Sequence, residues 1–327
     1  MILEGFRIYH YKEVPSTNKE ALGLIEKGIS NETVIIADKQ TEGRGRTGKS
    51  WISPEGNFYA SLVVNLFKNY LDKSPLSVSF QRMTLESRNQ EAWIPVSSTG
   101  MTSDGTGITV GLTSQVKDIS KLTELTFVTA LAVGNTLLSL NFLNNQTHCG
   151  VIPVRDTGIH TFSSGSQCKS TGMTRDPFIN DLNLQYKWPN DVLIDGKKIS
   201  GILLEKKSNS NWLIIGIGIN VNHAPLPGTT CISNYGGSVS NIDLLKKLII
   251  NFNKLRKQWL FDGFHAIREM WLTRAFKVNE QITIKLVDKL YEGIFADIDK
   301  SGKLVLQQKD GSLIYFDAGE LFIGSAL

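Results

Sequence analysis

Cysteine is scarce in this sequence, which has three in 327 residues. Cys149, Cys168 and Cys231 are an odd number, and none belongs to a C-x-x-C pair. A disulfide framework needs an even set of cysteines, and a structural zinc site needs paired ligands. The pattern argues against both and is typical of a protein in the reducing cytosol.

The sequence also lacks the marks of secretion or membrane insertion. Its first residues do not combine a basic segment with an apolar stretch, so we expect no signal peptide. The longest apolar run, about 125–140, contains threonines, Gly134 and Asn135, which favours a buried helix over a membrane crossing. We therefore expect a cytoplasmic protein with no membrane partner.

Charge of one sign is not in large excess. Thirty-five basic residues stand against 31 acidic ones, a formal net charge of +4. A surplus of this size does not by itself indicate a nucleic-acid or membrane surface. Hydrophobic residues at 41% are typical of a globular protein, and the chain length favours two domains.

Strand-like and helix-like patterns alternate through the first 275 residues. Ser16 can cap a helix that runs through Ile25. Apolar residues recur at helical spacing from 241 to 276, and Gly263 is expected to divide that stretch into two helices. Three short runs rich in β-branched residues predict buried strands: 33–37, 58–64 and 212–221. Together these patterns indicate an α/β domain.

After Phe276 the pattern changes to short strands separated by turn residues at 299–302 and 310–311. The expected strands are 282–286, 291–298, 304–306 and 313–316. Four such strands in about fifty residues predict a small β-barrel appended to the larger domain.

Two segments, about 75–119 and 146–180, do not fit either pattern. They are rich in Ser, Thr and Gly, and they share the phrases IPV and STGMT. We interpret them as two insertions of related origin, which a surface accepts because longer loops add little closure entropy. A functional lid is the alternative, and an insertion that folded inward would obstruct a pocket.

Residues 43–50, GRGRTGKS, match the pattern of a phosphate-binding P-loop. A P-loop needs a strand directly before it and a helix directly after it. Here residues 38–42 intervene, and Pro54 and Gly56 oppose a helix. The context therefore argues against a P-loop. Three glycines still free the backbone to wrap an anion, and Arg44 and Arg46 add forked cationic donors. When the segment is taken alone, a mobile, solvated basic loop is the favoured interpretation.

Other motifs join this loop: KWPND at 187–191, GILLE at 201–205 and GIGIN at 216–220. With Ser16-Thr17-Asn18 and Gln40, this set closely resembles the biotin–protein ligases, over about residues 16–67, 122–140 and 184–222. The resemblance implies an α/β (α+β), class II synthetase-like catalytic domain with a mixed sheet at 1–275. It also implies a C-terminal SH3-like β-barrel at 276–327.

What the resemblance implies for biotin begins with Ser16, Thr17 and Asn18, which would hold the ring system together with Gln40. Biotin's ureido group carries two N–H donors and one carbonyl, so a mostly apolar pocket must satisfy it with short polar groups. The remaining implied biotin-binding residues are Arg44, Gly45, Arg46, Lys198 and Gly201. Ser16 could instead serve only as a helix cap.

For ATP, the resemblance implies that Trp51 covers the adenine and that four polar residues hold the phosphates and magnesium: Lys187, Asn190, Asp191 and Asn220. Asp191 would be the magnesium ligand, since this ion takes few carboxylates besides phosphate oxygens. Arg46 and Lys198 would be the catalytic cations. Without the motif, Trp51 would be taken for a core residue and Lys198 for a solvated turn lysine.

The implied activity is ligation in two steps, through biotinyl-AMP to one lysine of a biotin carboxyl carrier protein. Because Ser16 comes so early, we expect no N-terminal DNA-binding domain and no repressor activity. The sequence leaves a homodimer open. A lipoate–protein ligase is the nearest rival. A non-catalytic nucleic-acid-binding module built on the basic loop and the barrel is the rival from another class, and it predicts salt-sensitive binding without ATP turnover.

Overall fold

The computed structural model describes most of the chain. The described residues are 1–65, 79–84, 91–96, 123–140, 182–207, 210–286, 289–317 and 320–322. The insertion expected at 146–180 lies outside them. Of the insertion expected at 75–119, the structure describes two strands, β5 (Ser79–Thr84) and β6 (Glu91–Val96), which pair with each other antiparallel.

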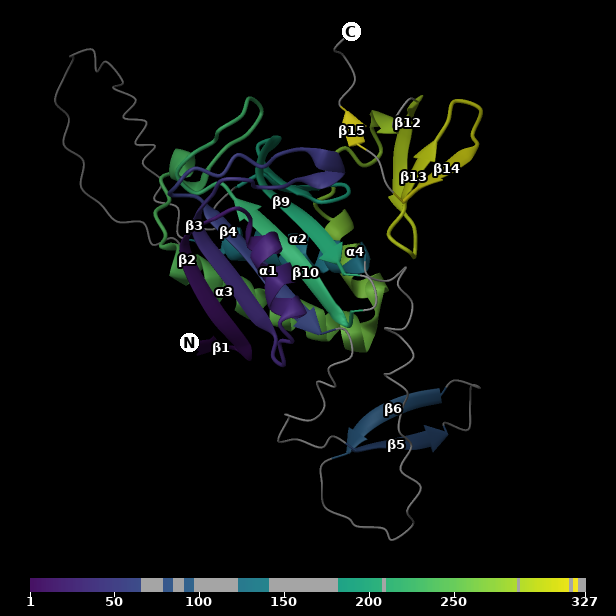
Figure 1. Ribbon diagram of the computed structural model, residues 1–327. Coiled ribbons are helices and arrows are strands. Elements are labelled where there is room, and N and C mark those ends of the chain that lie inside the picture. Colours follow the sequence, from purple (N-terminus) through teal and green to yellow (C-terminus); the bar gives the residue numbers. More distant parts are fainter. Residues whose placement is uncertain are drawn as a thin grey trace, which may run out of the picture.

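The larger domain is built on an eight-stranded sheet in the order β1-β2-β3-β4-β10-β9-β8-β7 (Figure 1). β2 and β3 run parallel and every other neighbouring pair is antiparallel, so the sheet is mixed, as predicted. Its strands are β1 (Ile2–Leu3), β2 (Phe6–Val14), β3 (Thr33–Gln40), β4 (Phe58–Asn65), β7 (Leu184–Lys187), β8 (Asp191–Ile194), β9 (Lys197–Lys206) and β10 (Trp212–Ile219).

Helices cover both faces of this sheet. α1 (Thr17–Glu26) lies on the front face in Figure 1, and α2 (Glu124–Leu138), α3 (Asn241–Asp262) and α4 (Phe264–Leu272) lie behind it. Ile35 packs toward α1, whereas its neighbours Val34 and Ile36 belong to the core on the other side. Alternate residues of a strand point to opposite faces, so a sheet covered twice needs continuous apolar strands.

The helix boundaries agree with the sequence patterns, with one correction at Ser16. Gly263 separates α3 from α4 with a φ of 76°, as predicted. Ser16 does occupy the N-cap position of α1, but its side chain makes no capping hydrogen bond. Ser240, by contrast, caps α3 by accepting a hydrogen bond from the Asp243 backbone.

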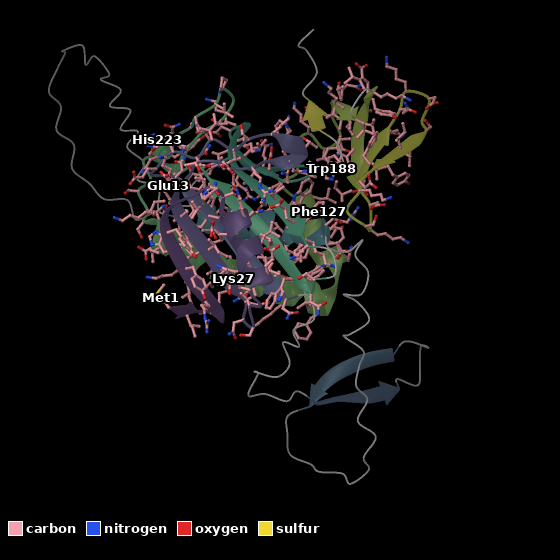
Figure 2. The ribbon with its side chains drawn as sticks, in the orientation of Figure 1. Met1, Glu13, Lys27, Phe127, Trp188 and His223 are labelled. Atoms are coloured by element: carbon pink, nitrogen blue, oxygen red, sulfur yellow. The ribbon has the colours of Figure 1, made fainter. Side chains whose placement is uncertain are left out.

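The C-terminal residues form a separate antiparallel sheet in the order β14-β13-β12-β11-β15. Its strands are β11 (Gln281–Leu286), β12 (Lys289–Ile298), β13 (Leu304–Gln307), β14 (Leu313–Phe316) and β15 (Glu320–Phe322). Trp188 donates a hydrogen bond from its indole nitrogen to the Gly302 carbonyl at 3.2 Å, and Phe127 also lies against Gly302. Figure 2 shows both aromatic residues on the side of the larger domain that faces this sheet.

Among the described residues, no helix combines the length and the apolar character that a membrane crossing requires. The run at 125–140 falls almost wholly in α2, whose residues are mostly buried.

A buried ion pair lies where β4 ends. The side chains of Arg256 in α3 and Glu32 are 4% and 3% exposed, and their charged groups lie 2.9 Å apart. Arg256 also donates to the Asn65 carbonyl, while Glu32 accepts from the Asn65 backbone N–H. The pair therefore fixes the end of β4 against α3.

Replacing Arg256 with Met should lower the free energy of unfolding by about 3–5 kcal/mol, because Glu32 would be left buried and unpaired. Urea denaturation followed by circular dichroism measures this. The double variant Arg256→Met, Glu32→Gln should recover part of the loss. A cost below about 1 kcal/mol for the single change would contradict a buried, mutually dependent pair.

Candidate active site

A cavity of about 790 Å³ opens at the ends of the central strands, next to the C-terminal sheet. Every site residue predicted from the sequence lines it. These are Ser16, Thr17, Asn18, Gln40, Arg44, Gly45, Arg46, Trp51, Lys187, Asn190, Asp191, Lys198, Gly201 and Asn220. Lys285 and Leu286 of β11 also line the cavity, so both sheets contribute to it.

The floor of the cavity is a pair of glycines on which Trp51 lies. Gly201 of β9 and Gly218 of β10 are direct cross-strand partners. A Cβ atom on Gly201 would lie 2.7 Å from the Trp51 ring, and one on Gly218 would lie 2.6 Å from it. Only backbone without side chains allows the indole to approach the sheet this closely.

Residues 43–50, here called the arginine loop, reach this floor as a tight hairpin-like turn. The Gly45 backbone N–H bonds the Lys49 carbonyl at 2.6 Å, and Trp51 bonds back to Gly43 at 2.9 Å. A single 3-10 turn, η1 (Arg46–Gly48), stands where a P-loop would begin its helix. Residues 49–57 are not helical, which agrees with the argument against a P-loop.

Burial of the Tyr59 side chain raises the pKa of its phenol far above the usual range, so the group stays neutral and can donate to the Pro54 carbonyl at 2.7 Å. This bond holds the segment that follows the arginine loop.

The start of α1 carries a chain of hydrogen bonds along one wall. Gln40 accepts from the Thr17 backbone N–H at 2.8 Å and donates to Ser53 at 2.9 Å. The Ser61 hydroxyl lies 2.8 Å from the Thr17 hydroxyl and within bonding distance of the Asn18 amide oxygen. These groups are buried or nearly so, and their mutual bonds satisfy the polar atoms while leaving the wall rigid.

Positive charge dominates the cavity. Lys198 forms an ion pair with Asp191 at 2.7 Å and lies 5.2 Å from the centre of the Trp51 ring. Arg46 donates to the Asn190 amide oxygen at 3.4 Å. The lining contains one carboxylate, Asp191, and six cationic side chains: Arg44, Arg46, Lys49, Lys187, Lys198 and Lys285. Such a concentration of one sign in a recess attracts anionic ligands.

Asn220 lines the cavity but is also tied into the protein. Its amide donates to the Thr230 carbonyl at 3.0 Å, and its side chain is buried. Asn57 lies beside it and accepts three backbone N–H groups, from residues 221, 222 and 223, each at 2.9 Å. Asn57 therefore fixes the turn that follows β10.

Sequence reasoning assigned no role to Ser53, Asn57, Ser61 or Glu205, and all four hold the predicted residues in place. Glu205 carried a signal in the sequence, because it ends the GILLE motif. Ser61 is a polar residue in an apolar strand, directly opposite Gly216. A buried serine in a strand is a sign of a satisfied polar network, which could have drawn attention to it.

A mixed sheet with a cationic cavity at its strand ends, closed by a glycine–arginine loop, defines a binding site for an anionic small molecule. The sequence profile of the biotin/lipoate A/B protein ligase family matches residues 11–99 and 118–222, and that of the biotin protein ligase C-terminal domain matches 277–324. The chain therefore belongs to the biotin/lipoate A/B protein ligase family. The resemblance that the motifs indicated is thereby confirmed.

Individual proteins agree with the family. A biotin–[acetyl-CoA-carboxylase] ligase of Paracoccus denitrificans is 27% identical over 321 residues, 94% of this chain and 97% of that one. The biotin protein ligase of Aquifex aeolicus in complex with biotin and ATP superposes with a TM-score of 0.62 at 21% identity, over 97% of both chains. A biotin protein ligase of Leishmania major in complex with biotinyl-5-AMP gives 0.53 at 20% identity, over 95% of this chain and 99% of that one. The two structures share this fold.

Replacing Gly218 with Ala should displace Trp51, because the added methyl meets its ring and overpacking of this kind costs about 1–3 kcal/mol. If Trp51 covers the adenine, as the motifs predict, ATP binding should then weaken by about tenfold. Calorimetric titration with ATP measures the change. Gly23→Ala is a matched control, since a Cβ at Gly23 in α1 meets no atom within 4 Å. Unchanged ATP affinity in a folded Gly218→Ala protein would mean that the glycine floor does not set the Trp51 position.

Proposed function

We propose that this protein is a biotin–protein ligase, which activates biotin with ATP as biotinyl-AMP and transfers it to a lysine of a biotin carboxyl carrier protein. The observation that carries the proposal is the convergence of the arginine loop, Lys187 and Lys198 on one cavity beside the polar wall of α1. Family membership and the biotin and ATP complexes of similar structures support it.

In this proposal the wall of α1 binds the ring system of biotin. Thr17, Asn18 and Gln40 present short polar groups that are already fixed by hydrogen bonds among themselves and to Ser61. Ser16 lies at the same wall, and its side chain makes no capping hydrogen bond to α1. Its hydroxyl is therefore available to the ligand. A site fixed in advance loses little entropy when it binds.

The biotin carboxylate then reaches the cationic part of the cavity. One carboxylate oxygen attacks the α-phosphorus of ATP, the new O–P bond forms, and the bond to pyrophosphate breaks with its electron pair. Arg44, Arg46 and Lys198 reduce the repulsion between the two anions and stabilise the charge that builds up in the transition state. The mixed anhydride biotinyl-AMP is the product, and Gly45 lets the arginine loop close over it.

In the second step the neutral amine of the carrier lysine attacks the acyl carbon. The acyl C–O bond breaks, AMP leaves with the electron pair, and the amine proton is lost. A closed arginine loop excludes water from the anhydride until the carrier arrives. Trp51 would cover the adenine with one face, since its other face lies on Gly201 and Gly218.

Magnesium fits the donor set as an ion carried by the nucleotide. Among the described residues no group of three His, Cys, Asp or Glu side chains could hold a metal ion by itself. Asp191 offers one carboxylate, with Lys187, Asn190 and Asn220 around the phosphates, and a bound Mg²⁺ would neutralise phosphate charge there.

Several finer features belong to the same proposal. The catalytic domain covers 1–275, and residues 276–327 close into an SH3-like barrel that contributes Lys285 to the cavity mouth. The enzyme works in the cytoplasm without nucleic-acid or membrane partners. The family match at 277–324 and the antiparallel sheet in that region support this division.

The decisive experiment incubates the protein with biotin, MgATP and an isolated biotin carboxyl carrier domain, and then measures the mass of the carrier. We expect one biotinyl group on one lysine, with no reaction when ATP is omitted or when lipoate replaces biotin. Lipoylation instead would favour the rival ligase activity. If neither acid is transferred, the proposed function is wrong.

Replacing Arg46 with Gly should let biotinyl-AMP escape, because the loop loses the guanidinium that bonds Asn190 and that would bind the phosphate in this proposal. Bystander proteins added to the reaction should then acquire biotin on surface lysines, as blotting with avidin would detect. Arg7→Gly removes the same charge from an exposed position in strand β2 and serves as the control. Unchanged selectivity for the carrier in the Arg46 variant would contradict a retaining role for the loop.

A further inference from the structure

Glu205 joins two parts of the cavity that the sequence motifs treat separately. It lies near the end of β9, and a single carboxylate oxygen, Oε2, accepts two hydrogen bonds. One comes from the Asn18 amide nitrogen at 2.6 Å, and the other comes from the Arg44 guanidinium at 2.8 Å. The start of α1 and the arginine loop are therefore connected through one atom.

The first of these bonds determines which way the Asn18 amide faces. An ionised carboxylate only accepts hydrogen bonds, so Asn18 must turn its nitrogen toward Glu205. Its oxygen then faces the Ser61 hydroxyl, and Gly216 leaves the space that the amide fills, since a Cβ there would lie 2.4 Å from that oxygen. With the orientation fixed, the second amide N–H of Asn18 would be the donor for a ligand carbonyl at this wall of the cavity.

The second bond holds the arginine loop. The Glu205 side chain is 26% exposed and that of Arg44 is 43% exposed, so the ion pair lies at the rim of the cavity in contact with solvent. An ion pair of this kind contributes only modestly to the stability of the loop position, and salt weakens it. A contact of this strength would favour the observed position of the arginine loop without locking the loop there.

We propose that Glu205 is a positioning residue that couples recognition of the biotin ring by Asn18 to closure of the arginine loop through Arg44. This proposal rests on the proposed function. A Glu205 side chain already immobilised by Asn18 loses less rotamer freedom when it also binds Arg44, so each contact strengthens the other. The same carboxylate therefore holds Asn18 in the orientation that recognises the ring and holds Arg44, and with it the arginine loop, beside the ring pocket.

The test uses the whole protein with biotin and MgATP and without carrier. The rate at which biotinyl-AMP escapes into solution is measured by trapping the released anhydride, and the KM for biotin is measured by pyrophosphate exchange. Glu205→Gln keeps a carbonyl oxygen for Asn18 but removes the charge that pairs with Arg44. We expect escape to rise about twofold to fivefold, the effect of a partly exposed ion pair, with the KM for biotin little changed.

Glu205→Ala removes both contacts and should raise the KM for biotin as well as the escape rate. The double variant Glu205→Gln, Arg44→Gln should leak no faster than Arg44→Gln alone, because both changes break the same pair. Glu26→Gln is the matched control. It breaks the ion pair between Glu26 in α1 and Lys207, directly after β9, whose charged groups lie 2.8 Å apart. Both residues lie outside the cavity lining, so neither the escape rate nor the KM for biotin should change.

Additive effects of the Glu205 and Arg44 changes on escape would overturn the proposal, as would a Glu205→Gln variant that only raises the KM for biotin. If the Glu205 variants do not fold, the dependence of biotinyl-AMP escape on salt concentration tests the proposal instead. Escape from the wild-type protein should rise more steeply with sodium chloride than escape from Arg44→Gln, because the variant has lost one of the ion pairs that salt weakens, and equal steepness would also overturn the coupling. A wild-type protein that makes no biotinyl-AMP would instead refute the proposed function itself.

Discussion

The site depends on a patch of the central sheet that carries no side chains. Gly201, Gly216 and Gly218 lie on two neighbouring strands, β9 and β10, and their missing Cβ atoms make the room that Trp51 and Asn18 occupy. Without that patch, neither the arginine loop nor the start of α1 could approach the sheet. The glycines stand in otherwise apolar strands, where they weaken the packing, so the sequence accepts a local cost to stability in order to form the cavity.

The cationic side chains of the cavity come from elements far apart in the sequence. The arginine loop, β7, β9 and β11 each supply some of them, and like charges gathered in a recess repel one another. Three partners offset that repulsion: Asp191 beside Lys198, Glu205 beside Arg44 and Asn190 beside Arg46. An anionic ligand would also offset the repulsion between these cations. Binding is therefore expected to raise the free energy of unfolding.

Most elements could be predicted from the sequence, because their patterns are local. The strand at Thr33, the strand at Phe58 and the break at Gly263 were all evident from apolar runs and a turn residue. The strand order was not evident, since β4 pairs with β10 across more than a hundred residues and no local pattern encodes that distance. The hairpin β5–β6, in the segment expected to be an insertion, was also missed, because that segment shows no sustained alternation of apolar and polar residues.

The residues of the site could be named from the motifs. The contacts that hold those residues in place could not be predicted in this way. All the motif residues share one cavity, yet their roles toward biotin and ATP remain predictions. In the amino-acid sequence, Glu205, Ser61 and Asn57 do not stand out from other polar residues. Their importance lies in contacts to residues more than forty positions away, which only a three-dimensional arrangement reveals.

The two ends of β4 are held by different contacts. Phe58 starts the strand opposite Ile219, the neighbour of the cavity-lining Asn220, and Asn65 ends it about 20 Å away, clamped by Arg256 and Glu32. Along its whole length β4 pairs with β10, the strand that carries Gly216 and Gly218. The buried clamp therefore helps to fix the register of the glycine-bearing strand from the end of β4 that is remote from the cavity.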